Sequence, residues 1–115
     1  MKFSEIILLC ALCLAACSAP AGDRTILPKV EQFDAVRGAQ DLLFQEHAVA
    51  LESIELVKIE DTDWSDSCLG LGRPDESCLA VITPGFRIEL RAEDNVYVIR
   101  TDQSGNAARL EAIIE

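Results

Sequence analysis

The sequence predicts an α+β fold in which one amphipathic helix packs on an antiparallel sheet of four or five strands. The prediction rests on an early segment with helical periodicity, several later segments rich in β-branched residues, and short turn-forming stretches between them. Strands that follow one another through short turns favour antiparallel neighbours. Residues 29–115 are therefore expected to form a single two-layer domain.

The expected helix covers residues 29–47. Its apolar positions recur at helical spacing and are Ala35, Val36, Ala39, Leu42 and Leu43. Polar residues occupy much of the opposite side. Because that side is not basic, we expect the apolar stripe to pack on the sheet rather than on a membrane. Gly38 lies within the segment, where a glycine lowers helix stability by about 1 kcal/mol relative to alanine.

The first expected strand covers residues 53–64, which are rich in β-branched and apolar side chains. Its alternation slips at Leu56 and the residue after it, which indicates a β-bulge. Residues 79–83 are apolar on both faces, as expected of a central strand. Pro84 and Gly85 then suit a turn, because proline sets φ at its first central position and glycine accepts a positive φ at the second.

The rest of the sheet is predicted from three further segments. Residues 86–91 alternate apolar and charged side chains, the pattern of a strand with one buried face. Residues 96–101 form the next expected strand, and residues 109–114 form the last. Turn-forming residues lie between these strands, at 93–95 and 102–106.

Cys68 and Cys78 flank a segment rich in glycine, proline, aspartate and serine, which continues neither a helix nor a strand. In an oxidising compartment two such cysteines are expected to pair, and closing so short a ring stabilises the fold by roughly 2 to 3 kcal/mol. The alternative is a catalytic or regulatory thiol pair, but the spacing is not C-x-x-C and no histidine is nearby in the sequence. We therefore predict a structural disulfide that closes a loop.

The first 17 residues have the pattern of an export signal. A short charged start precedes an apolar run over residues 6–16, which is shorter than the roughly 20 residues that a membrane-spanning helix needs. The run ends in Leu-Ala-Ala-Cys and resembles the bacterial lipobox, although the start holds a single base, Lys2, opposed by Glu5. The resemblance implies cleavage before Cys17 and a diacylglyceryl group on its sulfur. Through Ser18 it also implies an outer-membrane location, facing the periplasm.

Residues 1–16 are thus expected to be a signal peptide and residues 17–28 a lipidated tether. The two cysteines within the signal leave with it, so the lipid on Cys17 and the loop disulfide account for every remaining cysteine. The mature chain of 99 residues (115 minus 16) keeps the net charge of −10, because the signal holds one base and one acid. So acidic a chain is expected to bind neither nucleic acid nor anionic lipid through its charge. Its membrane contact is expected to be the lipid anchor.

The expected helix and three motifs that follow it together span most of the expected domain. The motifs are W-x-D-x-C-L-G at 64–70, V-I-T-P-G-F at 81–86 and Y-V-I-R-T-D-x-x-G at 97–105. Together they resemble a group of small secreted bacterial domains of uncharacterised function. That group often carries a Cys-Pro pair after the Leu-Gly, where this chain has Leu71 and Gly72. The resemblance supports the fold and implies no activity.

No set of catalytic residues is evident in the sequence. The only histidine, His47, lies near the expected helix end, where a surface or capping role is the favoured interpretation. The patterns G-x-S-x-G and H-E-x-x-H and a Gly-rich phosphate loop do not occur. We expect neither enzymatic activity nor a cofactor.

An acidic run leads into the loop and two more acidic residues lie on its far side. These residues are Glu60, Asp61, Asp63, Asp66, Asp75 and Glu76. Calcium takes several oxygen ligands, so a calcium site is an alternative, but the spacing matches no EF-hand or RTX pattern. We favour a solvated acidic surface and predict no metal site.

The candidate binding residues lie in and around the loop and are Trp64, Leu69, Leu71, Arg73 and Phe86. Trp64 is favoured as a core residue, whereas its exposure beside the other apolar candidates would indicate a surface for a partner. The leading hypothesis is a non-enzymatic, membrane-anchored lipoprotein that presents the disulfide-closed loop to a protein or an envelope component. The alternatives are an inhibitor of a secreted hydrolase or protease that uses Arg73, and a small hydrolase that uses acidic residues.

Overall fold

The computed structural model describes residues 26–115. The expected signal peptide (residues 1–16), the lipidation site Cys17 and most of the expected tether lie outside the described residues. Within the described part, no helix is both long enough and apolar enough to cross a bilayer.

The helical layer begins with a short 3₁₀ turn, η1 (Val30–Gln32), which leads directly into α2 (Phe33–His47). This confirms the helix predicted over residues 29–47. The helix ends at His47 because Ala48 adopts a left-handed conformation with φ of 56°.

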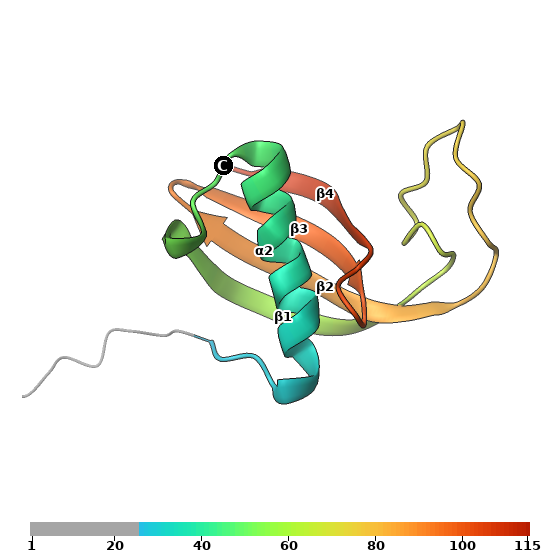
Figure 1. The fold of residues 1–115 in the computed structure, drawn as a ribbon, viewed down its shortest axis with the longest axis horizontal. Helices are drawn as coiled ribbons and strands as arrows, with labels where there is room; N and C mark the ends of the chain where they lie inside the picture. Colours follow the sequence, from blue (N-terminus) through green and yellow to red (C-terminus); the bar gives the residue numbers. More distant parts are fainter. Residues whose placement is uncertain (1–25) are drawn as a thin grey trace, which may run out of the picture.

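Four strands form one antiparallel sheet in the order β1-β2-β3-β4. Their bounds are β1 (Ile54–Trp64), β2 (Thr83–Ala92), β3 (Asn95–Asp102) and β4 (Ala108–Ile114), and a second 3₁₀ turn, η2 (Leu51–Ser53), precedes β1. Each strand pairs with its neighbour in the sequence, so the sheet is a meander. Figure 1 shows α2 crossing this sheet, and the predicted α+β fold is confirmed.

Two register slips interrupt the sheet. The slip between Leu56 and Lys58, in the pairing of β1 with β2, confirms the bulge predicted there. The second slip, between Val98 and Ile99 in the pairing of β3 with β4, has no counterpart in the predicted pattern.

The predictions of a strand at residues 79–83 and of a turn at Pro84 and Gly85 are wrong. β2 begins only at Thr83, opposite the last residue of β1, so residues 79–82 have no strand to pair with and belong to the loop. Pro84 and Gly85 continue β2. Because the last residue of β3 is paired with Gly85, Pro84 lies beyond β3, where its missing N–H costs no hydrogen bond to that strand.

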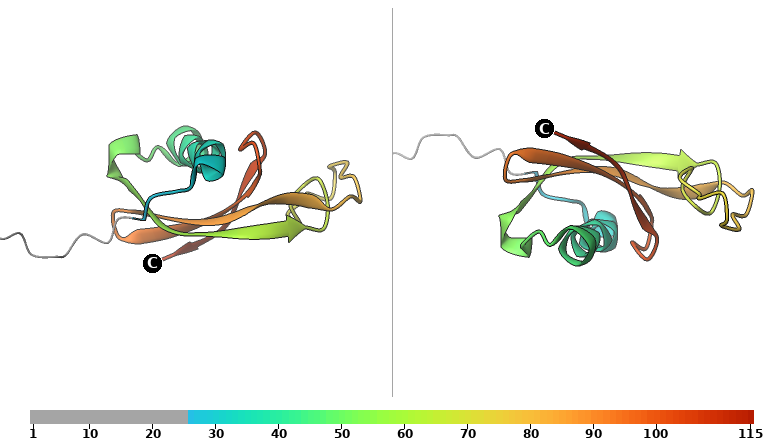
Figure 2. Two further views of the ribbon diagram at one scale, coloured as in Figure 1. Left: turned by 90° about the horizontal axis from the view of Figure 1, so that it is seen from below. Right: turned by 90° about the horizontal axis from the view of Figure 1, so that it is seen from above.

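Figure 2 shows that α2 lies over one face of the sheet, and the core lies between the two. Alternate residues of the strands point toward the helix and meet its apolar stripe. The core residues are Ala35, Val36, Ala39, Leu43, Val49, Leu56, Phe86, Ile88, Leu90, Ala92, Tyr97 and Ile99, with Leu42 partly buried beside them. The predicted apolar face of the helix is therefore the face that packs on the sheet.

The other face of the sheet carries a network of arginine and glutamate side chains. Arg87 pairs with Glu89 at 3.2 Å and with Glu111 at 3.1 Å. Arg100 pairs with the same Glu111 at 2.7 Å, and the hydrogen bond from Arg100 is the main reason that the pKa of Glu111 is lowered. All of these side chains are partly exposed, so the network is expected to fix their geometry more than to add stability.

Candidate functional site

Residues 65–82, which connect β1 to β2, form the stapled loop. Figures 1 and 2 show that it extends beyond one end of the sheet, while the described chain begins at the opposite end of the molecule. Cys68 and Cys78 form a disulfide across it, with their Cα atoms 5.5 Å apart. The predicted disulfide is confirmed.

Asp66 shapes the first limb of the stapled loop. Its Oδ1 accepts hydrogen bonds from the N–H groups of Cys68 and Gly70, both at 2.9 Å. Between those two residues Leu69 has a positive φ of 60°, which is unfavourable for leucine, and its side chain is fully buried. The two hydrogen bonds and the burial of Leu69 together hold this turn in place.

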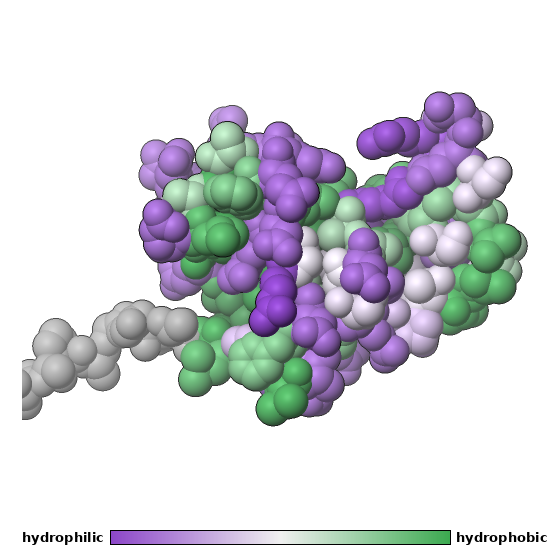
Figure 3. Space-filling model, viewed as in Figure 1, coloured by the Kyte–Doolittle hydropathy of each residue, from purple (hydrophilic) through white to green (hydrophobic). Residues whose placement is uncertain are grey.

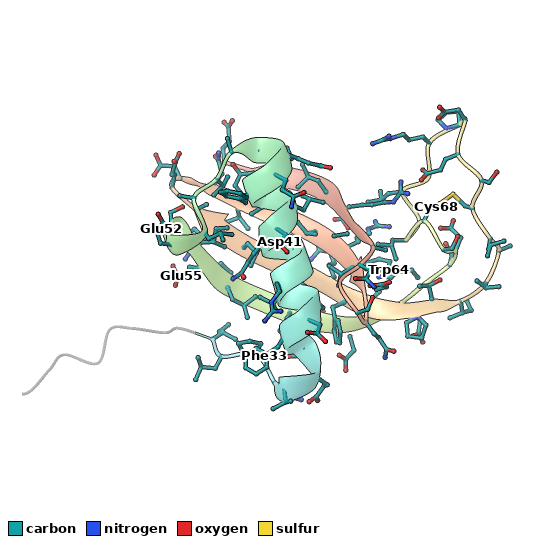
Figure 4. All side chains as sticks on the ribbon, viewed as in Figure 1. Phe33, Asp41, Glu52, Glu55, Trp64 and Cys68 are labelled. Atoms are coloured by element: carbon teal, nitrogen blue, oxygen red, sulfur yellow. A yellow bond between two sulfur atoms is a disulfide. The ribbon has the colours of Figure 1, made fainter. Side chains whose placement is uncertain are left out.

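Arg100 of β3 joins the first limb to the sheet. Its guanidinium lies over the ring of Trp64, 4.6 Å from the ring centroid, and its Nη1 donates to the carbonyl of Leu69 at 2.8 Å. Trp64 is buried, and its Nε1 donates to the carbonyl of Thr101 at 2.9 Å. The favoured interpretation of Trp64 as a core residue is thus confirmed. Figure 4 shows Trp64 and Cys68 at the same end of the sheet.

Arg109 of β4 holds a second part of the loop, at Leu71 and Glu76. It pairs with both carboxylate oxygens of Glu76 and donates to the carbonyl of Leu71 at 3.2 Å. Glu76 also accepts the backbone N–H of Arg73 at 3.0 Å. The hydrogen bonds from Arg109 and from the Arg73 backbone lower the pKa of Glu76 to about 2. Two arginines on neighbouring strands therefore fix the loop against the sheet.

The return limb of the stapled loop presents an exposed apolar run. Leu79 and Ile82 are each 68% exposed, and Val81 is 52% exposed. The N–H of Ser67 donates to the carbonyl of Leu79 at 2.9 Å, and the N–H of Leu79 donates to Ser67 Oγ at 2.8 Å, which ties the two limbs together. Figure 3 shows apolar surface at this end of the molecule. A contiguous exposed apolar run on an ordered loop is typical of a contact surface.

The structure separates the candidate binding residues. Trp64, Leu69 and Phe86 are buried, Leu71 is half-buried and Arg73 is exposed. The exposed patch considered for Trp64 and its apolar neighbours is therefore not formed.

The sequence reasoning missed Leu79, Val81 and Ile82 as surface residues, because it assigned them to a central strand. Their position directly after Cys78 could have indicated that they belong to the loop. Because the disulfide joins Cys78 to Cys68, the chain must first return from Cys78 to the sheet before the next strand can begin.

A cleft of about 510 Å³ lies between the end of α2, the stapled loop and β4. His47 lines it at the last position of α2, close to the helix end predicted from the sequence. Its ring lies tilted against that of Tyr97, with centroids 5.9 Å apart and 52° between the ring planes. Glu76 and Arg109 also line the cleft and neutralise each other. Two of the charged residues at the cleft wall are thus paired with each other, and its histidine packs against Tyr97, an arrangement that suits a structural role.

Among residues 26–115, one group of three residues has ligand atoms close enough to hold a metal ion, namely Asp66, Cys68 and Cys78. The two sulfur atoms are bonded to each other and the Asp66 carboxylate accepts two N–H groups, so these atoms already have partners. The acidic run also does not gather at one point, because Glu60 and Asp61 are consecutive in β1 and point to opposite faces.

These features define a class of small α+β domain in which the loop between the first two strands is closed by a disulfide and tied to the sheet by arginines. The chain belongs to the family described as a domain of unknown function, DUF8738, whose pattern matches residues 36–110. The matched region runs from α2 into β4 and contains the whole stapled loop. No curated protein and no solved structure matches this chain.

Proposed function

We propose that this chain is a non-enzymatic lipoprotein of the bacterial cell envelope that presents the stapled loop to another protein or to an envelope component. The proposed anchor is the lipid on Cys17, on the periplasmic side of an outer membrane. The Leu-Ala-Ala-Cys ending of the apolar run supports the anchor. The pairing of Cys68 with Cys78 supports it too, because Cys17 would otherwise be a free thiol in an oxidising compartment. The net charge of −10 argues against a nucleic-acid partner.

The observation that carries the binding role is the exposed run of Leu79, Val81 and Ile82 on a loop of fixed shape. The disulfide, Arg100 and Arg109 hold the backbone of this loop. A loop that is already ordered loses less conformational entropy when it binds, so more of the contact energy remains as affinity. Three neighbouring apolar side chains favour a partner with an apolar groove or flat apolar surface.

Intact-mass analysis of the protein purified from its native membrane tests the anchor. We expect a chain that begins at Cys17, carries acyl groups and has lost two hydrogen atoms through the disulfide. An unprocessed chain in the cytosol with both loop thiols free would contradict the proposal.

A pair of matched variants tests the loop. Val81→Asp places a charge in the proposed contact, whereas Ile114→Asp changes a residue of the same 52% exposure at the end of β4. Partners are cross-linked in intact envelopes and quantified after pull-down. Because an unpaired charge is costly in an apolar interface, we expect roughly a tenfold loss of recovery for Val81→Asp and none for Ile114→Asp. Equal recovery with both variants would rule out the loop as the contact.

A second candidate function is inhibition of a secreted hydrolase. It is favoured by Arg73, whose side chain is exposed while its backbone N–H is held by Glu76. Inhibition assays against secreted proteases, with the native protein and with Arg73→Ala, would test it. A small hydrolase is the less favoured function, because, of the two glutamates that line the cleft, Glu46 and Glu76, the second is paired with Arg109.

A further inference from the structure

The N-terminal patch consists of four exposed apolar residues at the start of the described chain: Ile26, Leu27, Val30 and Phe33. Leu27 is 83% exposed and Val30 is 81% exposed, which makes them the two most exposed large apolar side chains in residues 26–115. Figure 3 shows this apolar surface at the lower left of the molecule, beside the point where the described chain begins. The helix stripe that packs on the sheet does not use these side chains, so the core does not explain them.

An apolar groove continues the patch. It has a volume of about 500 Å³ and lies between the first turns of α2 and the start of β1. Phe33 and Val36 line it from the helix, and Ile54 and Leu56 line it from the strand. Patch and groove together form a continuous apolar surface at this end of the domain.

The distance to the proposed anchor identifies the occupant of this surface. Ile26 lies nine positions after Cys17 in the sequence (26 minus 17). Even fully extended, nine steps of the chain span only about 30 Å. A lipid on Cys17 would therefore hold the patch close to the bilayer surface at a high effective concentration, so that even weak apolar contacts are occupied.

Charge near the patch permits this approach. Within residues 26–37, Lys29 and Arg37 offset Glu31 and Asp34, so this segment has no net charge in a chain whose net charge is −10. Glu55, which also lines the groove, is paired with Arg91 at 3.7 Å. Headgroups with no net charge are then expected to be accepted, whereas an anionic surface would repel the rest of the chain.

We infer that the N-terminal patch lies on the surface of the bilayer that carries the anchor, with Phe33 and Leu27 at the boundary between headgroups and acyl chains. This inference rests on the proposed lipidation of Cys17. The stapled loop lies at the opposite end of the sheet from the start of the described chain, so a domain seated on the patch directs the loop away from the membrane (Figure 1). Figure 4 shows Phe33 and Cys68 well apart along the molecule. The bilayer thus orients the domain as well as retaining it.

Two matched tryptophan variants of the full chain test the inference. Phe33 and Phe44 lie on the same helix and are 52% and 53% exposed, but only Phe33 belongs to the patch. Phe33→Trp and Phe44→Trp are produced in a bacterium that processes lipoproteins and reconstituted into phosphatidylcholine–phosphatidylethanolamine vesicles with or without brominated acyl chains. The native protein supplies the background from buried Trp64. Intact mass and circular dichroism verify the anchor and the fold of each sample.

Because a side chain at the headgroup boundary is within reach of brominated chains, we expect roughly a twofold loss of the added fluorescence for Phe33→Trp and little loss for Phe44→Trp. Adding Leu27→Ser and Val30→Ser to Phe33→Trp should restore most of the signal. Equal responses of the two tryptophan variants in acylated protein would overturn the inference and leave the proposed function standing. Protection of Phe33→Trp from aqueous iodide without quenching by brominated lipid would assign the patch to a second copy or another protein, and would also overturn it. Absence of acyl groups would overturn both.

Discussion

Gly38 provides a test of how α2 packs, because helix propensity and packing predict opposite results for Gly38→Ala. Alanine in a helix interior is more favourable than glycine by about 1 kcal/mol. However, a Cβ on Gly38 would lie well inside contact distance of the Gly105 carbonyl oxygen and 2.8 Å from the Gly105 Cα. Gly105 belongs to the turn between β3 and β4 and has a φ of 77°, so the obstacle is backbone that no rotamer change can move.

Overpacking of this kind costs about 1 to 3 kcal/mol, and a backbone obstacle belongs at the upper end of that range. After the gain in propensity, we expect Gly38→Ala to lower the free energy of unfolding by about 1 to 2 kcal/mol. For a domain of this size the melting temperature would fall by roughly 5 to 15 °C. Thermal and urea unfolding followed by circular dichroism measure the change, with exposed Gln45→Ala in the same helix as the control. A Gly38→Ala protein at least as stable as the native one would refute the close packing of α2 on this turn.

Three further predictions concern the buried hydroxyl, the disulfide and the loop ion pair. The Oγ1 of Thr101 is buried without a hydrogen-bond partner, so Thr101→Val should be neutral or raise stability by up to about 1 kcal/mol in urea unfolding, and a clear loss would mean that the hydroxyl has a partner. Replacing Cys68 and Cys78 by serine should cost about 2 to 3 kcal/mol in the same assay but leave the far-ultraviolet spectrum of the folded state intact, because the core cluster lies outside the loop. The pKa of Glu76 is lowered from 4.5 to about 2, so the stabilising effect of its pair with Arg109 is complete above about pH 4.5 and is lost as the pH falls toward 2. In Arg109→Met that pKa should rise toward 4.5 in an NMR titration, and a native value already near 4.5 would disprove the pairing.

Much of this fold could be predicted because its local patterns are unambiguous. The stripe formed by Ala35, Ala39 and Leu43 has helical spacing, and all three side chains are fully buried in the structure. Residues 86–91 alternate strictly, and their apolar members face the helix. The disulfide was predictable as well, since a turn-rich segment between two cysteines brings its ends together.

What could not be predicted depends on neighbours that are distant in the sequence. Residues 79–82 have the composition of a buried strand, but a strand also needs a partner, and β1 has already ended opposite Thr83. The conformation of Leu69 depends on the hydrogen bond that Asp66 accepts from Cys68 and on the hydrogen bond that Arg100 donates to the Leu69 carbonyl. Arg100 is 31 positions away from Leu69 in the sequence. From helix propensity alone, Gly38 is expected only to lower the stability of α2. The reason for a glycine at this position is the close approach of the turn at Gly105, which the sequence does not show.

Residues whose side chains do not suit their surroundings, such as apolar side chains exposed to solvent, are expected at functional sites, where binding or catalysis requires them despite a cost in stability. Leu79, Val81 and Ile82 meet this description, since they favour a buried sheet and remain exposed beside a disulfide. The loop that carries them is attached through Arg100 and Arg109, outside the core cluster. Substitutions in the exposed run can therefore change a contact without disturbing the packing of α2. For the same reason, binding and folding should be separable by mutation in this domain.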